Sequence, residues 1–406
     1  MNGVFRAVKV TDYVYWVGAV DWTLRDFHGY STSRGTTYNA YLILADKIVL
    51  VDTVKSPFKQ EMLARIASVT NPENITYIIS NHSEMDHSGC LPEMIEMVKP
   101  EKVFASAMGV KALHEHFHMG GGITAVRDGE TLSLGNMTLR FFETKMLHWP
   151  DSMVTYLPEQ AVLFSQDAFG MHLASSERFD DEISEDILVR EAAKYYANIV
   201  MPFSPIVTKT LEKIRNLNVP IHMIAADHGP IWRKGIGKIL ELYAKWAKHH
   251  PTKKAVILYD TMWQSTAKMA RAIAEGIMAE GAQAKVMALS ASHRSDVATE
   301  VLDAGALVVG SPTMNNNLFP TVADVLCYLR GLKPGNLIGA AFGSYGWSGE
   351  AVEQIESILK EMKVDLVGKG ISVRYVPTDE ALAQCASLGR LVAEQLKQRC
   401  DKPQQE

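Results

Sequence analysis

The stretch NHSEMDHSGC, residues 81–90, directly follows a short apolar run and gathers four potential metal ligands at the end of an expected strand. His82 and Glu84 are separated by one residue, so both side chains can point to the same side as the chain leaves the strand. Asp86 and His87 come where a helix should begin and can turn toward a second ion. The spacing H-x-E-x-D-H therefore favours two metal ions over one.

Three further ligand candidates also follow predicted strands, and these are His148, Asp167 and His228. A single histidine or aspartate after a strand is usually a cap or a hydrogen-bonded polar residue. Seven nitrogen and oxygen ligands at four strand ends instead predict two three-ligand positions that share one bridging carboxylate.

The first half of the chain, residues 1–250, mixes hairpins with helices. Hairpin turns are predicted at Asp46–Lys47, at Gly135–Asn136 and near Glu159–Gln160, each between two apolar stretches. The segment EMLARIASV has helical spacing and leads into the strand ITYIIS. This pattern indicates mixed sheets covered by helices rather than a purely parallel sheet.

The second half, residues 251–406, alternates strictly between strands and helices. A polar, proline-containing link precedes it, and His249 and His250 in this link are expected to be solvated. The predicted strands are AVILYD, QAKVMAL, ALVVGSP, LIGAAFGSYG and ISVRYV. Five parallel strands predict a doubly wound sheet, whose ligand should lie at the carboxyl ends of the strands.

The loops at those carboxyl ends predict a phosphate and flavin site. In YDTMWQSTAKMA, hydroxyl groups lead into a helix N-terminus, an arrangement that suits a terminal phosphate. No G-x-x-x-x-G-K-[ST] or G-x-G-x-x-G motif is present, which disfavours a triphosphatase or a dinucleotide site. GSPTMNNNLFP offers amides and FGSYGWSGEA offers flat aromatic surface. The residues expected to contact the cofactor are Thr261, Met262, Trp263, Gln264, Ser265, Thr266, Pro312, Thr313, Met314, Asn315, Asn316, Ser344, Tyr345, Gly346, Trp347, Ser348 and Gly349.

Residues 254–400 resemble flavodoxin, and the resemblance implies FMN with the strand order 2-1-3-4-5. Gln264 stands where flavodoxins usually carry glycine, a variation that also occurs in the flavodoxin modules of flavodiiron proteins.

The first half resembles the metallo-β-lactamase superfamily, whose αββα sandwich carries the signature H-x-H-x-D-H followed by isolated His, Asp and His ligands. Glu84 replaces the second histidine of that signature, and its hard oxygen donor favours iron over zinc. This set is the pattern of flavodiiron proteins. The resemblance implies two non-haem iron ions bridged by Asp167, with His82, Glu84 and His148 on one ion and Asp86, His87 and His228 on the other.

Other histidines and aromatic residues are expected to play smaller parts. His28, His172 and Tyr196 lie in segments similar to those that line the di-iron pocket of this family, which implies hydrogen bonding or proton delivery. Trp149 is expected to form part of the pocket wall. Three histidines on one predicted helix are expected at the surface, because their i, i+2 spacing puts them on different faces: His114, His116 and His118.

Composition narrows the class of protein further. The 406 residues are 47% hydrophobic and 21% charged with a net charge of −5, which gives no reason to expect nucleic acid or membrane binding. The N-terminus has no apolar signal region, and the four cysteines form no C-x-x-C pair. A cytoplasmic protein is therefore expected.

Together the two resemblances imply a flavodiiron oxidoreductase that reduces O2 to water, NO to N2O, or both. Electrons would pass through FMN from an external donor, a rubredoxin or alternatively a reduced deazaflavin. The family further implies a head-to-tail homodimer or a dimer of such dimers. Two alternatives stay open: a zinc hydrolase with a regulatory flavodoxin domain, disfavoured by Glu84, and a pure electron carrier with a vestigial metal site, disfavoured by the seven intact ligand candidates.

Overall fold

The computed structural model describes residues 4–401 and divides the chain into two compact units. The first unit contains the described chain up to His28 together with Thr32–Tyr195 and Pro205–Ala244. The second unit contains Gly29–Ser31, Tyr196–Ser204 and the chain from Lys245 onward.

One sheet of the first unit begins with antiparallel strands and ends with parallel ones. Its strands run in the order β1-β2-β7-β8-β9-β10-β11. The hairpin predicted at Asp46–Lys47 joins β7 to β8, and β8, β9, β10 and β11 then pair in parallel. The bounds are β1 (Val8–Lys9), β2 (Val14–Trp16), β7 (Tyr41–Ile43), β8 (Ile48–Val51), β9 (Ile75–Ser80), β10 (Lys102–Ser106) and β11 (Ile123–Val126).

The other large sheet of this unit contains the two remaining predicted hairpins. Its order is β12-β13-β14-β15-β16, antiparallel except for the last pair. The bounds are β12 (Thr131–Ser133), β13 (Thr138–Glu143), β14 (Met153–Leu157), β15 (Val162–Gln166) and β16 (Met223–Ala226). Between β2 and β7 in the sequence, β3 (Ala19–Asp21) pairs antiparallel with β6 (Thr36–Tyr38). The two-residue strands β4 (Asp26–Phe27) and β5 (Tyr30–Ser31) lie between these two in the sequence, and β5 belongs to the second unit.

The two sheets face each other and helices cover their outer faces. Buried side chains from both sheets, such as Trp16, Phe104, Phe141 and Phe164, form one continuous core between them. A second core lies between the first sheet and its helices. The predicted αββα sandwich is confirmed. The helices of this unit are α1 (Lys59–Ala67), α2 (Met85–Ser88), α3 (Leu91–Val98), α4 (Ala107–Phe117), α5 (Glu185–Tyr195), α6 (Ser204–Asn216) and α7 (Ile236–Ala247). The first residue of α6 and the last three of α7 belong to the second unit.

The second unit is a doubly wound sheet. Its main strands pair in parallel in the order β18-β17-β19-β21, with β22 and β23 both beside β21. This order is the predicted 2-1-3-4-5, to which the short β20 adds an antiparallel partner for β19. The bounds are β17 (Lys254–Tyr259), β18 (Gln283–Ala288), β19 (Ala306–Met314), β20 (Asn317–Leu318), β21 (Ile338–Tyr345), β22 (Asp365–Leu366) and β23 (Ile371–Arg374).

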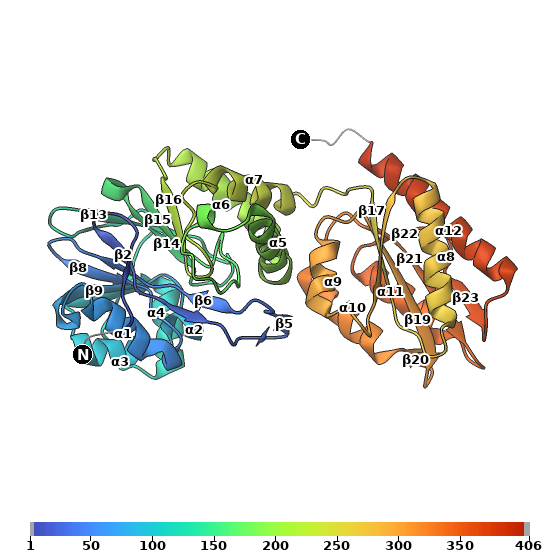
Figure 1. The fold of residues 1–406 in the computed structure, drawn as a ribbon, viewed down its shortest axis with the longest axis horizontal. Coiled ribbons are helices and arrows are strands. Elements are labelled where there is room, and N and C mark those ends of the chain that lie inside the picture. The colour runs from blue at the N-terminus through green and yellow to red at the C-terminus, as the bar shows by residue number, and fades with distance from the viewer. Residues whose placement is uncertain (1–3, 402–406) are drawn as a thin grey trace. The chain divides into compact units, whose positions relative to one another are not determined.

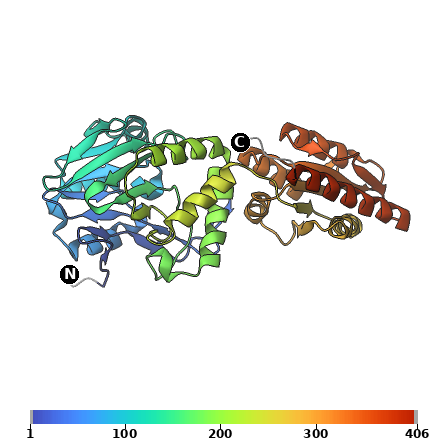
Figure 2. The ribbon, with the colours of Figure 1, turned by 90° about the horizontal axis from the view of Figure 1, so that it is seen from above.

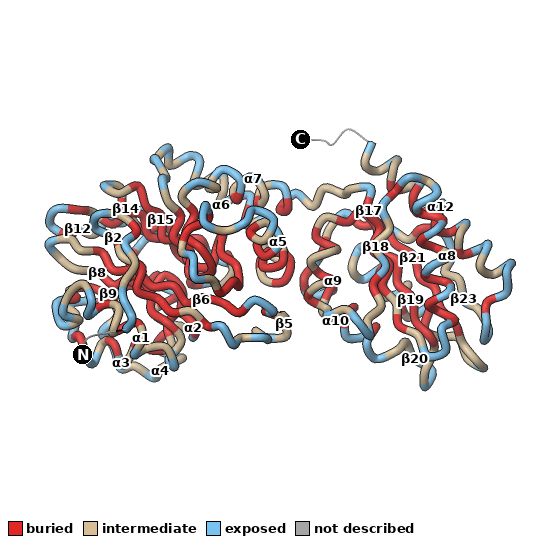
Figure 3. The backbone as a smooth tube through the Cα atoms, viewed as in Figure 1, coloured by how far each residue is buried: buried red, intermediate tan, exposed pale blue. Residues whose placement is uncertain are grey.

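Helices lie on both sides of this sheet, and its central strands β17, β19 and β21 are buried (Figures 1 and 3). On one side α8 and α12 share a core with the strands, and α12 is the dark red helix of Figure 2. These two helices cross at glycines: a Cβ built on Gly276 would lie 2.0 Å from the Ala386 carbonyl oxygen, and one on Gly389 would lie 2.1 Å from that of Ile273. The helices of this unit are α8 (Ser265–Ala279), α9 (Arg294–Val301), α10 (Pro320–Leu332), α11 (Glu350–Glu361) and α12 (Asp379–Cys400).

Two smaller observations complete the fold. His249 is half-buried and its Nδ1 accepts the Gly335 N–H at 3.4 Å, so the link packs against the second unit instead of leaving this residue solvated as predicted.

Among residues 4–401, no helix combines the length and the apolar character required to cross a bilayer.

Candidate metal and flavin sites

The ligand candidates of NHSEMDHSGC are fixed by the junction of β9 with α2. His82 comes two residues after the end of β9, and Glu84 is the N-cap residue of α2. Asp86 and His87 lie within that short helix and are buried. Thr53, from a distant part of the sequence, fixes the main chain of α2. The His87 carbonyl accepts the main-chain N–H of Thr53 at 3.0 Å and the Thr53 hydroxyl at 2.6 Å.

The three remaining candidates follow strands of the second sheet. His148 lies in the turn after β13, Asp167 follows β15, and His228 comes two residues after β16. The structure brings all seven predicted ligand candidates together at one edge of the sandwich.

The first group contains His82, Glu84, His148 and Asp167, whose ligand atoms all lie within 4.8 Å of one another. His82 Nε2 is 3.3 Å from both Glu84 Oε2 and Asp167 Oδ2. His148 Nε2 is 2.9 Å from the same oxygen of Asp167. Ligands bound about 2.1 Å from a common ion at right angles are about 3 Å apart, so this spacing fits one metal ion.

The second group contains Asp86, His87 and His228, again within 4.8 Å. Asp167 faces this group with its other oxygen, Oδ1, at 3.1 Å from His87 Nε2 and 3.4 Å from His228 Nε2. The carboxylate of Asp167 thus presents one oxygen to each group.

The hydrogen bonding of these residues fits bound cations. Both carboxylate oxygens of Asp86, Oδ1 of Asp167 and both ring nitrogens of His87 are buried without a hydrogen bond among the described residues. Buried polar atoms are ordinarily paired, and leaving one unpaired costs about 1–3 kcal/mol. Metal ions at the two groups would remove this cost for the atoms that face them.

Acceptor-only partners set the tautomers of two histidines. His82 donates its Nδ1–H to Asp151 Oδ2 at 3.2 Å, and His228 donates its Nδ1–H to the Thr37 carbonyl at 2.6 Å. Each ring therefore leaves Nε2 as the atom with a free lone pair, and in both rings Nε2 is the atom that faces the carboxylates.

Two carboxylates of the site are shifted in opposite directions. Burial alone would raise the pKa of Asp167, but the imidazoles of His87 and His148 outweigh it and hold that pKa well below the ordinary range. The pKa of Asp227 is raised well above its usual value by burial and by the neighbouring carboxylate of Asp52. Asp167 is therefore the anion of the pair, as a bridging ligand must be.

Two of the three predicted pocket residues lie beside the ligand groups. His28 Nε2 is 3.7 Å from Glu84 Oε1, although the His28 side chain is largely exposed. The buried ring of His172 lies 4.6 Å from that of His228, and its Nδ1 is 2.9 Å from the Thr36 hydroxyl. Burial lowers the pKa of His172 well below its usual value, so this imidazole is neutral.

Tyr196 has a different environment from the one expected. Its hydroxyl is 3.0 Å from the Ser204 hydroxyl and its ring packs on Trp246. The neighbouring Tyr195 is the tyrosine beside the ligand groups, with its ring 5.1 Å from His172 and 6.1 Å from His228. On a helix, adjacent residues point about 100° apart, and the sequence KYYAN does not distinguish them.

The ring of Trp149 lies 5.1 Å from His82 and forms part of the wall, as expected. His116 is only half-exposed, because its Nδ1 lies 3.1 Å from the Ser83 carbonyl within the ligand loop. His116 is therefore only partly covered, as His114 is. His118 is exposed as predicted, and His114 is half-exposed with its Nδ1 2.5 Å from the Met119 carbonyl.

A cavity of about 560 Å³ opens at the carboxyl ends of the strands in the second unit. Trp263 and Trp347 line it and are 88% and 87% exposed, which leaves their indole rings available to stack on a flat ligand. The other lining residues are Met262, Ser265, Pro312, Thr313, Asn315, Asn316, Ser344, Tyr345, Gly346, Ser348, Tyr375 and Val376.

The predicted phosphate loop lies at one end of this cavity. Gln264 adopts φ +67 at the N-cap of α8, and the following Ser265 and Thr266 are buried. Thr261 Oγ1 is buried without a hydrogen bond among the described residues, so this hydroxyl can donate a hydrogen bond to a bound phosphate oxygen. This loop fits a terminal phosphate. Of the remaining predicted contacts, Met314 ends β19 and Gly349 is the N-cap residue of α11.

Sequence reasoning missed several neighbours of these sites. Tyr375 and Val376 follow β23, so the rule that ligands lie at strand carboxyl ends could have found them. Asp151 and Thr36 carry no such local signal, since their contacts with His82 and His172 join distant parts of the chain.

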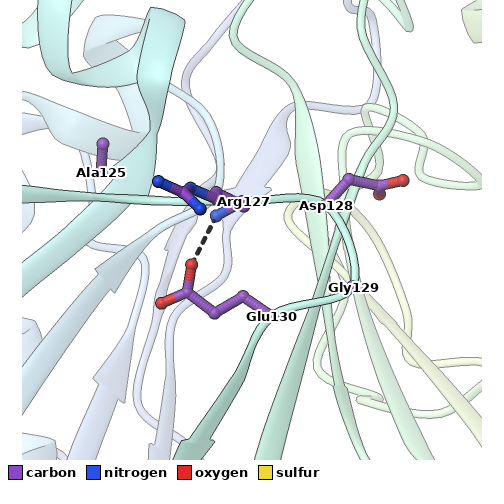
Figure 4. A pocket seen from close by; sticks show the side chains of 5 residues that line it. All are labelled: Ala125, Arg127, Asp128, Gly129 and Glu130. Carbon is purple, nitrogen blue, oxygen red and sulfur yellow. Dashed lines mark hydrogen bonds between the residues drawn. The ribbon is translucent and has the colours of Figure 1, made fainter.

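An open hollow beside the turn between β11 and β12 is separate from both sites (Figure 4). There Glu130 Oε2 accepts the main-chain N–H of Arg127 at 2.9 Å. Its lining residues include none of the ligand candidates.

Comparisons with known proteins agree with both halves. Residues 36–229 match the family described as ODP family beta lactamase, and residues 257–389 match Flavodoxin. The nitric oxide reductase of Moorella thermoacetica is 49% identical over 96% of this chain and 98% of its own. The solved rubredoxin oxygen:oxidoreductase from Desulfovibrio gigas is 45% identical with a TM-score of 0.96, covering 98% of this chain and 100% of that one. The flavodiiron protein from Giardia intestinalis is 34% identical with a TM-score of 0.95, covering 98% of both chains.

Proposed function

Because the chain belongs to the flavodiiron proteins, we propose that it is an oxidoreductase that reduces O2, NO or both at a non-haem di-iron centre with electrons relayed through FMN. The observation that carries this proposal is the pair of ligand groups joined by Asp167, in which buried carboxylate oxygens and imidazole nitrogens lie at ligand-to-ligand distances.

When bound, FMN supplies one-electron transfer and the two iron ions supply the centre at which a diatomic gas is reduced. The residues that would hold one iron are His82, Glu84 and His148, and those for the other are Asp86, His87 and His228, with Asp167 shared. Glu84 adds an oxygen donor where zinc enzymes of this superfamily carry histidine, which favours iron. The FMN would lie in the cavity between Trp263 and Trp347, with its phosphate at Thr261 and the start of α8.

The chain's own residues define the pocket beside the ligand groups. His28 stands 3.7 Å from Glu84 and is largely exposed, so it can exchange protons with water and pass them toward the site. His172 is neutral and buried, and its hydrogen bond with the Thr36 hydroxyl fixes the orientation of its ring. We place Tyr195 in the pocket, beside His172, in the role that the sequence had suggested for Tyr196.

We propose that a separate small reductant, a rubredoxin or alternatively a reduced deazaflavin, delivers electrons to the FMN. The exposed rim formed by Trp263 and Trp347 supports this, because a partner can reach the cavity mouth directly. We further propose that the protein works in the cytoplasm as a head-to-tail homodimer. Size measurement in solution and cell fractionation test these two points.

The test of the proposed function is amperometric. Protein loaded with iron and FMN and supplied with enzymatically reduced rubredoxin would be given O2 and NO in separate runs. Consumption of either gas is expected, and the ratio of the two rates assigns the preferred substrate. If the donor reduces the flavin but neither gas is consumed, the proposed reductase is refuted. Metal analysis of the protein as purified tests the alternative, since mainly zinc would support a hydrolase.

A further inference from the structure

His82 and His228, the two histidines whose tautomers are fixed, donate their Nδ1–H to different kinds of acceptor. His228 donates its Nδ1–H to a main-chain carbonyl, that of Thr37. His82 donates to a carboxylate, that of Asp151, whose side chain is 3% exposed. A third ring, that of His87, has its Nδ1 3.7 Å from Asp227 Oδ2, which is beyond hydrogen-bond length.

Asp151 is itself held in place from three directions. Its Oδ2 accepts the N–H of Ser83 at 2.6 Å as well as the His82 proton. Its main-chain carbonyl accepts the hydroxyl of Ser106, which also caps α4 by accepting the Gly109 N–H. A Cβ built on Gly109 would be 3.8 Å from that of Asp151, so Asp151 lies against the first turn of α4, where a helix dipole favours negative charge.

This geometry has a direct effect on His82. With Nδ1–H tied to Asp151 Oδ2, Nε2 is aimed between Glu84 Oε2 and Asp167 Oδ2, 3.3 Å from each. A carboxylate on the far nitrogen also increases the electron density that an imidazole offers through Nε2. One ligand group therefore contains a histidine strengthened by a buried anion, whereas the histidines of the other group do not have such a hydrogen bond among the described residues.

We propose that Asp151 is a positioning residue for the metal centre, which fixes the orientation of His82 and through its charge favours the oxidised state of the iron that His82 helps to hold. This inference rests on the iron centre proposed above. It concerns the chain's own hydrogen bonds and needs no assumption about which gas is reduced.

Two substitutions separate the hydrogen bond from the charge. Asp151→Asn can keep an oxygen where Oδ2 now accepts from Ser83 and His82, so it removes the charge and keeps these hydrogen bonds, with an NH2 group in place of the unpaired Oδ1. Asp151→Ala removes both. A matched control is Asp180→Asn, since Asp180 is also buried in the first unit and accepts main-chain N–H groups from Arg233 and Gly235 without contacting a ligand candidate.

The experiment measures iron affinity by competition with a chelator, and the midpoint potentials of iron and flavin by redox titration with EPR and optical detection. Asp151→Asn should retain two iron ions per chain and shift the iron potential to more positive values, because removal of a negative charge disfavours the oxidised state. Asp151→Ala should lose about 10–100-fold in iron affinity. The flavin potential of both Asp151 variants, and the iron affinity and the two potentials of Asp180→Asn, should equal those of the wild type.

Wild-type iron potential in Asp151→Asn, or wild-type iron affinity in Asp151→Ala, would overturn the inference. If Asp151→Ala fails to fold, as judged by circular dichroism, Asp151→Asn decides alone. A wild-type protein that binds no iron would refute the proposed function, whereas a wild type with two iron ions and unaffected variants would refute this inference only.

Discussion

At the scale of single residues, the choice of metal depends on one ligand. Glu84 supplies an anionic oxygen at 3.3–3.4 Å from the Nε2 atoms of His82 and His148. An imidazole in its place would be a softer donor with no charge, and it would restore the zinc signature of the superfamily.

The substitution Glu84→His should therefore lower the iron-to-zinc ratio of the protein by about tenfold, which corresponds to about 1.4 kcal/mol of lost preference. The measurement is elemental analysis after expression with equal concentrations of both metals. Glu73→His adds a histidine at an exposed position away from the site and should leave the ratio unchanged. An unchanged ratio in Glu84→His would show that Glu84 does not select the metal.

A second prediction at this scale concerns the buried thiol of Cys385. Burial raises its pKa from 9.0 to about 11. The pKa of this thiol is higher in the folded state than in the unfolded chain. Its contribution to the free energy of unfolding is therefore fully present below pH 9 and is lost as the pH rises toward 11. Relative to Cys385→Ala, the wild type should lose about 1.4 kcal/mol of unfolding free energy per pH unit in this window. Urea unfolding at pH 8 and pH 10.5 measures the difference. Ser387, exposed in the same helix and without a titrating side chain in this range, provides the control, since Ser387→Ala should differ from the wild type by the same amount at both pH values.

The metal ligands could be predicted from the sequence because their signal is local. Four of them lie within six residues, and the other three each follow a strand that the apolar pattern identifies. The supporting residues could not be found in this way. Asp151 meets His82 across 69 positions, and Thr36 meets His172 across 136, so only the folded chain brings them together.

At the scale of elements, the crossing of α8 and α12 depends on Gly276 and Gly389. Gly276→Ala would place a methyl group 2.0 Å from a main-chain carbonyl oxygen that cannot move without shifting α12. We expect a loss of about 1–3 kcal/mol or more in the stability of the second unit. Thermal unfolding monitored by release of FMN measures it.

Gly331→Ala provides the matched control, since it also lies in a helix, α10, with nothing within 4 Å of an added Cβ. It should be neutral or stabilise by up to about 1 kcal/mol, because alanine favours the helix. Equal stability of Gly276→Ala and the wild type would mean that the helices are not in contact at this point.

The strands and hairpins followed from apolar alternation and turn residues, and the turns at Asp46–Lys47 and Gly135–Asn136 were confirmed. Short elements escaped prediction. The strand β20 forms because Asn315 and Asn316 both adopt positive φ, which reverses the chain after β19. Such turns are common for asparagine, but the run NNN does not show where the turn lies.

At the scale of the whole molecule, each cofactor is expected to stabilise the unit that holds it. Iron would satisfy buried ligand atoms in the first unit, and FMN would fill the cavity of the second. A ligand present at 1,000 times its Kd contributes about 4 kcal/mol to the folded state. Calorimetry of the holoprotein, the iron-free form and the FMN-free form should therefore show that removal of each cofactor lowers a different unfolding transition. Equal shifts of both transitions on removal of either cofactor would contradict this expectation.

The sequence predicts only in part which segments belong to each of the two units. The change from hairpins to alternating strands and helices indicated two domains, but Gly29–Ser31 and Tyr196–Ser204 also belong to the second unit. In that unit Asn198 accepts the Tyr328 hydroxyl at 2.7 Å and donates to the Ser295 carbonyl at 3.1 Å. These contacts join residues about 100 positions or more apart in the sequence, and no periodic pattern of residues predicts them.

The placement of tryptophan gives the protein an optical signal of its own. Of seven tryptophans, Trp263 and Trp347 border the flavin cavity and are almost fully exposed, whereas Trp16 and Trp232 are buried in the first unit. Indoles stacked beside an isoalloxazine ring lose emission, and exposed indoles without it are open to collisional quenchers such as iodide. The intrinsic fluorescence of the chain should therefore fall when flavin binds, without any label. Iodide reaches the exposed Trp22 in both forms and does not reach the buried tryptophans, so only the contribution of Trp263 and Trp347 to the quenching should depend on flavin.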